Sequence, residues 1–559
     1  MAGALLAATV LAAPGAAQAA PSGLFVGDYS TTTISQFTIG AGGALSLNGT
    51  APTGTHSWTL AATPNGKYLY ATNNGDGTIS QYSIGSGGTL SPLFPATVPT
   101  GTTPQQVAVS PDGKNVYVAN GGGSVGAGSV TVYGVGSGGT LTLLSTVTTD
   151  LSTITPEGLA ISPDGSSVYV SGEGASSATN AIVEFNRSSD GSLTPKSSAS
   201  VPTVTSGTID LVITPDGQYV YATGANSSVI QEYTVGSGGE LTPASGPPVP
   251  EGSSNYQLTI SPNGKNLYAA NCGTTTNSIY QYSIGSGGAL SPLSPPAVNS
   301  GGTCPELQWM TANGAYLYAP DFNSTSNSSV GDVSMFSVGS GGALSLKGTV
   351  PAGAGASDVV IAPDQGPRAS FSTSAARVGK ATTFNASGSS DSDGTVASYR
   401  WNFGDGHSLT TTSAQISHTY TKPGRHTVTL TVTDDSGCSA QLVFTGQTAY
   451  CNPTTPTVSH TVKVASATRP LRLSVSPRRA HADVRACYSF RAVSKGHGVK
   501  NVKVKLAGHT TRTAGNGTAK LCLKLRRGTY TARASRKGYA TAAARITVTT
   551  RARVPGFTG

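Results

Sequence analysis

Two glutamates, Glu157 and Glu306, stand at the same place in two copies of a repeated motif, six residues before the position that a turn proline holds in most copies. Two carboxyl groups that face one pocket can act as general acid and base, or hold a calcium ion that polarises the carbonyl group of a substrate. His56, near the same place in an earlier copy, is an outlying third candidate. These three residues are the candidate catalytic groups.

Other copies carry side chains suited to binding at this place. Trp58 and Tyr256 offer flat rings on which a sugar or a peptide can stack, and Gln105 offers an amide. Together with Glu157 and Glu306 they form the candidate ligand-binding set. Ordinary solvated strand starts would show the same residue types, so the sequence leaves open a generic surface, a ligand funnel and a hydrolase.

The elements that must position these residues are the strands of the repeat. Each copy has a strand ending in a Pro-Asp-Gly or Pro-Asn-Gly turn, a second strand with the pattern aliphatic-Tyr-aliphatic, a third strand, and a Gly-Ser-Gly-Gly turn before a fourth. The turn glycines recur at intervals of 47, 52, 52, 47 and 50 residues, at Gly66, Gly113, Gly165, Gly217, Gly264 and Gly314. A repeated four-stranded unit of this length predicts the blades of a β-propeller.

The ends of the repeat predict how the ring closes. The chain enters on a second strand, Leu24 to Asp28, and leaves on a lone first strand, Val359 to Asp364. Pairing of these segments completes a seventh blade and hides both sheet edges. We predict an all-β fold: a seven-bladed β-propeller over residues 21–366 with two-ended ring closure, followed by two immunoglobulin-like sandwich domains.

The copy from Ser110 to Asn120, Ser-Pro-Asp-Gly-Lys-x-x-Tyr-Val-Ala-Asn, resembles the repeats of the lactonase-type seven-bladed propellers. That family includes 6-phosphogluconolactonases and muconate-lactonising cyclases, so the resemblance implies the fold and raises lactone hydrolysis as an activity. The histidine that such relatives commonly carry at the start of one innermost strand is missing, and Arg187 is the one arginine before residue 367. Because a phosphate needs cationic partners, an enzyme with this propeller should act on an unphosphorylated lactone.

The first 20 residues and the cysteines predict export. An apolar run from Leu5 to Ala13, followed by small residues, is typical of a secretory signal peptide, and no later stretch is long and apolar enough to predict a transmembrane helix. The six cysteines fall two per region, which favours the pairs Cys272–Cys304, Cys438–Cys451 and Cys487–Cys522. We expect a secreted, extracellular bacterial protein, associated with the cell wall.

Residues 367–467 resemble a PKD domain, through the segments Trp401-Asn402-Phe403-Gly404-Asp405-Gly406 and His418-Thr419-Tyr420. The resemblance implies an immunoglobulin-like sandwich of a kind found on cell surfaces and in secreted hydrolases. A cysteine-flanked insertion, Cys438 to Cys451, departs from that pattern. Asp391 and Asp393 could hold calcium, the one cofactor that the sequence suggests, although a plain Asp-Gly turn explains them as well.

Residues 468–559 alternate between apolar and polar side chains, which predicts a half-buried antiparallel sheet, and they weakly resemble carboxypeptidase-regulatory-like and other bacterial immunoglobulin-like modules.

The charges of the three regions differ sharply. Residues 1–366 hold 6 Lys or Arg against 19 Asp or Glu, residues 367–467 hold 7 against 5, and residues 468–559 hold 21 against 1. A domain of net charge +20 is attracted to polyanions. We expect an anionic cell-surface polymer or polysaccharide as partner, and no specific nucleic acid, because the basic strands lack interleaved aromatic residues. A merely solvated surface, or docking on the acidic propeller, is the alternative.

Two functions fit these patterns. The first, which we favour, is a binding or adhesion module in which the propeller presents a binding face, the PKD-like domain is a spacer and the basic domain contacts a surface. The second is an extracellular lactonase-like hydrolase.

Overall fold

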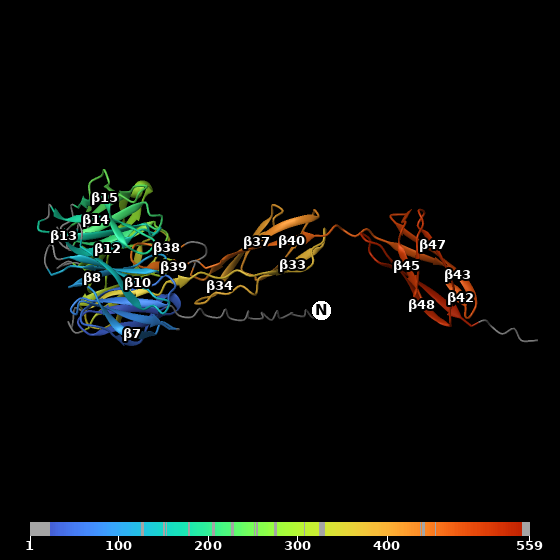
Figure 1. Ribbon diagram of the computed structural model, residues 1–559, viewed down its shortest axis with the longest axis horizontal. Coiled ribbons are helices and arrows are strands. Elements are labelled where there is room, and N and C mark those ends of the chain that lie inside the picture. The colour runs from blue at the N-terminus through green and yellow to red at the C-terminus, as the bar shows by residue number, and fades with distance from the viewer. Residues whose placement is uncertain are drawn as a thin grey trace, which may run out of the picture.

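The computed structural model of the chain describes residues 23–550 apart from short gaps at 86, 124–127, 149–150, 152–153, 177–178, 204–206, 225–227, 251, 253–254, 273–276, 307, 324–329, 437, 439–441 and 453. The predicted signal peptide, residues 1–20, lies outside the described residues. The regular elements given for the described residues are β-strands and two 3-10 turns, Ala41–Gly43 and Ser286–Gly288. Figure 1 shows a propeller, a sandwich that contains β34 and β37, and a second sandwich that contains β43 and β48 along one long axis.

In the described part of the chain, seven sheets form the blades, and six of them are continuous in sequence. The strands of each blade are given with the innermost strand first. Blades 1 to 3 are blade 1 (β4 Ser57–Ala62, β5 Tyr68–Asn73, β6 Thr78–Ile84, β7 Leu90–Pro99), blade 2 (β8 Pro104–Val109, β9 Asn115–Asn120, β10 Ser129–Val135, β11 Leu141–Val147) and blade 3 (β12 Ile154–Ile161, β13 Ser167–Gly174, β14 Ala181–Arg187, β15 Leu193–Pro202). Blades 4 to 6 are blade 4 (β16 Thr208–Ile213, β17 Tyr219–Gly224, β18 Val229–Val235, β19 Leu241–Pro243, β20 Val249–Pro250), blade 5 (β21 Asn255–Ile260, β22 Asn266–Cys272, β23 Asn277–Ile284, β24 Leu290–Asn299) and blade 6 (β25 Thr303–Pro305, β26 Trp309–Met310, β27 Tyr316–Asn323, β28 Asp332–Val338, β29 Leu344–Pro351).

Blade 7 closes the ring from both ends of the propeller segment. Its inner strand β30 (Ala356–Ile361) pairs with β1 (Gly23–Asp28), which is followed by β2 (Thr33–Ile39) and β3 (Leu45–Pro52). The pairing is antiparallel, with Leu24 opposite Ile361 and Val26 opposite Val359. The predicted fold class, including the two-ended closure, is therefore confirmed.

The repeated tyrosine links each blade to the next. The hydroxyl of Tyr70 in blade 1 donates a hydrogen bond to the carbonyl of Gly139 in the glycine-rich turn of blade 2, at 2.7 Å. Five further blade-to-blade bonds of this kind are made by Tyr117, Tyr169, Tyr221, Tyr268 and Tyr318. Each such bond contributes about 1 kcal/mol net, which explains why the tyrosine and the glycine turn recur together.

The two sandwiches follow the propeller. The first has one sheet of β32 (Ser372–Thr373), β33 (Ala381–Asn385) and β36 (Gln415–Thr419), and a second of β34 (Val396–Asn402), β35 (Ser408–Thr411), β37 (Gly424–Asp434) and β40 (Thr457–Val464). The last has one sheet of β41 (Arg472–Ser476), β43 (Arg485–Ser494), β44 (His497–Gly498) and β47 (Thr518–Lys524), and a second of β42 (Arg479–His481), β45 (Lys503–Leu506), β46 (His509–Arg512), β48 (Gly528–Ser535) and β49 (Ala542–Thr549). Trp401 is fully buried in the first sandwich and belongs to its hydrophobic core.

The cysteine-flanked insertion leaves the first sandwich and enters the propeller. Its strands β38 (Val443–Phe444) and β39 (Ala449–Asn452) form a small sheet with β31 (Asp364–Gln365), and Figure 1 shows β38 and β39 within the propeller body. All three predicted disulfides are present, at Cys272–Cys304, Cys438–Cys451 and Cys487–Cys522. The second of them ties the two ends of the insertion together.

We call residues 444–450 the stopper loop, because they meet the ends of the innermost strands. The main-chain N–H groups of Val109, Ile161 and Ile213 donate to the carbonyls of Gln447, Gly446 and Thr445, at 2.9, 2.9 and 3.0 Å. The stopper loop thus satisfies donors at the ends of blades 2, 3 and 4 that would otherwise be buried without a partner.

Side chains of the stopper loop extend this contact around the ring. Gln447 Nε2 donates to the carbonyls of Leu159 and Leu211, at 3.1 and 2.7 Å. The ring of Tyr450 stacks on Trp309 of blade 6, with centroids 4.5 Å apart. The loop therefore covers the channel at the strand ends, and the strand starts form the opposite mouth.

Candidate functional site

The mouth of the channel, where the innermost strands begin, holds a group of four aromatic rings. Tyr29 stacks on His56 with centroids 4.4 Å apart, and it meets Trp58 edge-on at 5.3 Å. Phe322 lies 5.6 Å from Tyr29 and 6.4 Å from Trp58. Trp58, Tyr29 and Phe322 are only partly buried. We call these four residues the aromatic patch; its exposed ring edges and faces can take a flat apolar ligand surface.

Three strand ends place the aromatic patch. Trp58 is the second residue of β4, Tyr29 follows β1 directly, and Phe322 lies near the end of β27. His56 precedes β4 with φ at 55°, a left-handed conformation that is uncommon outside glycine. Sequence reasoning found Trp58 and His56 but missed Tyr29 and Phe322. An alignment of the second-strand ends would have found them, since other copies have Asn74, Gly121 or Cys272 there.

Glu306 lies buried at the start of blade 6's innermost segment. Its main-chain N–H donates to the carbonyl of Pro320 at 2.9 Å, while Oε2 of its carboxyl is buried without a hydrogen-bond partner. Burial, followed by the nearby Asp358 and Asp321 carboxyls, raises the pKa of Glu306 well above its usual range. A raised pKa favours the protonated form of the carboxyl, which can donate a hydrogen bond or a proton.

Glu157 has a different set of neighbours. Burial raises its pKa to about 7, and the Glu173 carboxylate adds to the rise. One oxygen of Glu157 is buried without a partner. The electrostatic partners of Glu157 and Glu306 do not overlap, and His56 packs on Tyr29. The structure thus supplies two separate acids with raised pKa values, and the catalytic role of all three residues stays a prediction.

Gln105 and Tyr256 are the remaining members of the candidate ligand-binding set. Gln105 is partly buried, and its main-chain carbonyl accepts a hydrogen bond from the hydroxyl of Thr59 at 2.8 Å. Tyr256 lies in β21, but its side chain is outside the described part of the structure. The assignment of Gln105 and Tyr256 to ligand binding stays a prediction.

Other buried acids of the channel hold the ring together. Asp358 accepts a hydrogen bond from the main-chain N–H of Leu60 in the next blade, and Asp210 accepts one from Leu258 at 2.8 Å. Gln106 accepts the equivalent bond from Leu159. The three acceptors occupy the same position of the repeat in blades 7, 4 and 2, and each bonds to the innermost strand of the next blade, so their role is explained by blade-to-blade bonding.

The cations of the propeller are engaged or on its rim. The guanidinium of Arg187 donates to both Asp112 carboxylate oxygens at 3.0 Å and to the hydroxyl of Tyr117 at 2.8 Å, and its side chain is 6% exposed. Lys196 is buried and donates to Asn186 and to the carbonyl of Gly238. These bonds occupy the groups that a phosphorylated ligand would need.

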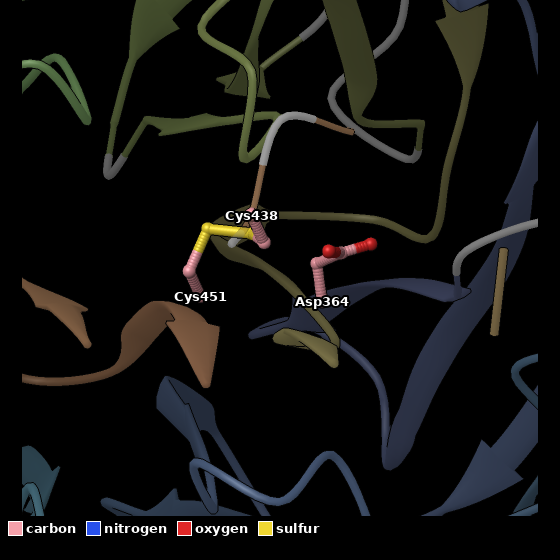
Figure 2. A group of neighbouring side chains, drawn as sticks. All are labelled: Asp364, Cys438 and Cys451. Carbon is pink, nitrogen blue, oxygen red and sulfur yellow. A yellow bond between two sulfur atoms is a disulfide. The ribbon is translucent and has the colours of Figure 1, made fainter. Parts of the chain in front are cut away.

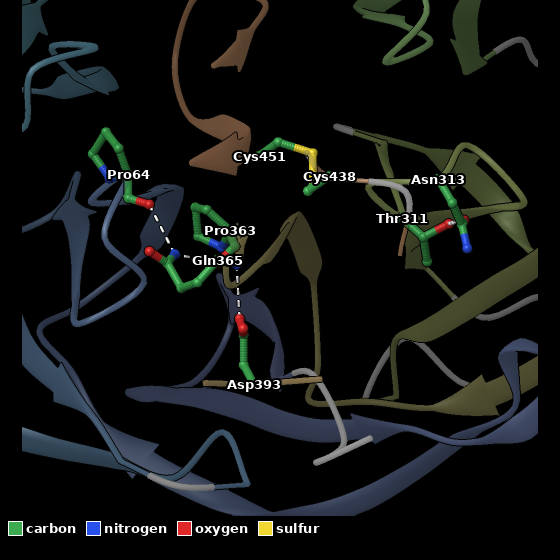
Figure 3. The surroundings of a disulfide bond; sticks show 8 residues. All are labelled: Pro64, Thr311, Asn313, Pro363, Gln365, Asp393, Cys438 and Cys451. Atoms are coloured by element: carbon green, nitrogen blue, oxygen red, sulfur yellow. Dashed lines mark hydrogen bonds between the residues drawn. A yellow bond between two sulfur atoms is a disulfide. The ribbon is translucent and has the colours of Figure 1, made fainter. Parts of the chain in front are cut away.

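An acidic cluster lies where the propeller meets the first sandwich. Asp364 of β31 is 8% exposed and its Oδ2 has no hydrogen-bond partner, and both carboxylate oxygens of Asp391 are buried without one. Asp393 accepts the main-chain N–H of Gln365 at 2.9 Å, as Figure 3 shows. Burial and the neighbouring Asp434 and Asp393 raise the pKa of Asp364 to about 9.

The disulfide Cys438–Cys451 lies beside Asp364 (Figure 2). A transition-metal site of Asp364 with these sulfurs would need thiolates, which the disulfide does not offer. The unpartnered carboxylate oxygens, by contrast, are the hard ligands that calcium prefers. Calcium at Asp391 and Asp393 stays a prediction, and Asp364 joins the candidate ligands.

The outer faces of the last sandwich are cationic. Lys503 lies directly opposite Arg512, and Lys505 lies opposite Arg533 on the same sheet. All four side chains are exposed. Asp483 is the single acidic residue of this domain. Like charges in facing positions destabilise a sheet, so the surface carries an electrostatic cost that an external anion would remove.

Comparison with known proteins finds a propeller model and a PKD domain model that match parts of this chain. A model of the seven-bladed lactonase propellers matches residues 20–255, and a PKD domain model matches residues 365–447. Among solved structures, a 6-phosphogluconolactonase-like protein of Bacteroides fragilis has a TM-score of 0.52 at 20% identity, over 61% of this chain and 98% of that one. The periplasmic gluconolactonase of Pseudomonas aeruginosa has a TM-score of 0.50 at 21% identity, over 61% and 99%. At these identities the likeness shows the fold.

Curated relatives match a short segment. The pre-pro-metalloprotease PrtV of Vibrio cholerae is 57% identical over 51 residues, which is 9% of this chain and 5% of that protein. A microbial collagenase of Vibrio alginolyticus is 38% identical over 69 residues, 12% and 8% of the two lengths. The chain thus spans less than a tenth of these relatives. Within the described residues, no helix has the length and apolar character needed to cross a membrane.

Proposed function

We propose that this chain, which carries a lactonase-type seven-bladed propeller and a PKD domain, is an exported bacterial binding protein that adheres to an anionic surface through its last domain. The propeller presents its mouth to a carbohydrate or peptide ligand, and the first sandwich joins the two. Three disulfides support export, because disulfides form and persist in oxidising compartments outside the cytosol.

The observation that carries the adhesion proposal is the unbalanced charge of the last sandwich. Lys503, Lys505, Arg512 and Arg533 face one another across neighbouring strands, and 21 basic residues stand against one acid in this domain. A linear polyanion laid across the sheet would pair with these cations and release its counterions. The first two domains, with net charges of −13 and +2, have no such surplus of cations.

Binding of the full chain to immobilised dextran sulfate at increasing salt tests this proposal. In the double variant Lys505→Gln/Arg533→Gln we expect elution at lower salt and a shallower dependence of affinity on salt, because two ion pairs are lost. The matched control is Lys67→Gln/Lys114→Gln, which removes the same charge from exposed lysines on the propeller rim. If control and test variants elute together, the basic domain is not the contact surface.

The propeller offers the second contact. The aromatic patch gives a stacking surface for a sugar ring, and Glu306, whose pKa is raised by burial, lies at the start of the innermost segment of blade 6. The engaged Arg187 and Lys196 argue for a ligand without phosphate. A junction calcium ion, held by Asp364, Asp391 and Asp393, would fix the propeller to the first sandwich.

A second function is favoured by the lactonase-type fold and by the raised pKa of Glu306. In that case Glu306 or Glu157 would transfer a proton during hydrolysis of an uncharged lactone. Turnover of a chromogenic lactone, lost in Glu306→Gln and unchanged in the rim variant Lys67→Gln, would replace the binding proposal for the propeller with hydrolysis.

A further inference from the structure

Three side chains of types that commonly bind metal ions, one aspartate and two histidines, meet at one end of the first sandwich. Asp405 and His407 lie in the turn between β34 and β35, and His418 lies in β36 of the opposite sheet. One donor atom of each residue lies within 4.8 Å of the other two. His418 Nε2 is 2.8 Å from Asp405 Oδ2, and His407 Nδ1 is 3.2 Å from Asp405 Oδ1.

Two of these side chains are held in place by the fold. The ring of His418 stacks on Phe403 at 4.1 Å, with 8° between the planes, and meets Tyr420 edge-on at 4.8 Å. The side chains of His418 and Asp405 are each 14% exposed, whereas His407 is 70% exposed. The cluster therefore has a fixed inner wall and one ligand on the solvent side that can adjust.

The spacing of the donors suits a tetrahedral ion. Bonds of about 2.0–2.1 Å from zinc to nitrogen or oxygen place neighbouring ligand atoms about 3.3 Å apart. His407 Nδ1 lies 3.2 Å from Oδ1 of Asp405, and His418 Nε2 lies 2.8 Å from its Oδ2, so each nitrogen is near that edge length from one of the two carboxylate oxygens. Two imidazoles and one carboxylate are a donor set that zinc accepts and that calcium and magnesium do not favour.

We propose that Asp405, His407 and His418 bind a zinc ion, with the fourth position open to solvent. The ion joins the turn that leads into β35 to strand β36 and so fastens the two sheets of the sandwich together. Three protein ligands with an open position leave room for a water molecule or for a donor atom of a bound ligand. This site is independent of the acidic cluster at the junction, because the two share no residue.

A hydrogen-bonded pair between His418 and Asp405 is the alternative explanation for part of this geometry. It requires no metal, and the contact of the exposed His407 with Asp405 is then an ordinary hydrogen bond on which no ion depends. The two explanations therefore differ in what the removal of His407 does to metal affinity.

Isothermal titration of the full chain with zinc chloride, in excess calcium to occupy the acidic cluster, tests the proposal. We expect one zinc ion per chain. Loss of a partner outside the metal's own ligands costs about 10–100-fold in affinity, so His407→Ala should weaken binding by at least about tenfold. The control His497→Ala removes an exposed imidazole from β44 in the last domain and should bind as the wild type does.

Two further readouts separate ligation from a structural effect. Cobalt(II) in place of zinc should give the strong visible absorption of a four-coordinate ion in the wild type and lose it in His407→Ala. At the same zinc concentration, zinc should raise the melting temperature of the wild type more than that of the variant, which binds it more weakly. Absence of zinc binding, or equal binding by wild type and His407→Ala, would overturn the assignment.

Discussion

At the scale of single residues, the mouth of the propeller is built from two strand ends per blade. An alignment of the first strands predicts Trp58, Gln105, Glu157 and Glu306 at the mouth, because these residues share one position of the repeat. That alignment cannot show which side chains touch, since contact depends on the neighbouring blade. Glu157 and Glu306 therefore look equivalent in sequence but have different electrostatic neighbours.

Trp58 provides the test of ligand binding at this scale. It is partly exposed, whereas Trp309 is 7% and Trp401 0% exposed, so a ligand at the mouth should change the tryptophan fluorescence chiefly through Trp58. Aromatic stacking contributes about 0.5–1.5 kcal/mol beyond buried area, so Trp58→Ala should weaken binding of a soluble oligosaccharide about fivefold or more.

The matched control for this measurement is Phe94→Ala, because Phe94 is 95% exposed in the outer strand β7 and far from the mouth in its blade. Titration calorimetry with a series of neutral oligosaccharides and peptides gives the affinities. Equal affinity in Trp58→Ala and wild type would place any bound ligand away from the aromatic patch.

At the scale of elements, the strands were predictable and the stopper loop was not. The blade strands follow from turn glycines and from a tyrosine that bonds to the next blade, and both are repeated features. The insertion between Cys438 and Cys451 has no period, and its partners are strand ends from several blades. The predicted disulfide marks the ends of the insertion but gives no sign of where it docks. The domain predicted as a spacer is thus also a part of the propeller channel.

Gln447 is the residue through which the stopper loop can be tested. Gln447→Ala leaves the buried carbonyls of Leu159 and Leu211 without their donors, which should cost about 2–4 kcal/mol in the free energy of unfolding of the propeller. Because Tyr450 stacks on Trp309, release of the loop should also change tryptophan fluorescence and speed amide exchange in residues 444–450.

The control is Gln415→Ala, which truncates an exposed glutamine in β36 of the same domain. We expect its unfolding free energy and its exchange rates to match those of the wild type. Identical denaturation curves for Gln447→Ala and wild type would mean that the loop does not stabilise the propeller.

At the scale of the whole molecule, the propeller and the first sandwich are joined by two neighbouring sets of contacts, the stopper loop and the acidic cluster. The stopper loop fills the channel end, and the acidic cluster lies at the point where β31 leaves the propeller (Figure 3). Sequence suggested Asp391 and Asp393 from their spacing, but Asp364 is distant in sequence and joins them only through the fold. Asp391 has both oxygens buried without partners, so in the absence of a cation its charge is a net cost.

Calcium should therefore reverse the order of stability between the wild type and Asp391→Asn. Without calcium, in a chelator, the variant should unfold at a higher temperature because one of several neighbouring carboxylates is gone. With calcium at about 100 times its dissociation constant, the wild type gains about 2.7 kcal/mol, while the variant, short of a ligand, gains much less. Asp483→Asn makes the same chemical change at an exposed site of the last domain and should follow the wild type in both conditions. Differential scanning calorimetry of the full chain measures all three proteins. If calcium shifts none of the transitions, the junction binds no calcium and its carboxyl groups are neutralised by protonation. The propeller then depends on the stopper loop for its attachment to the first sandwich.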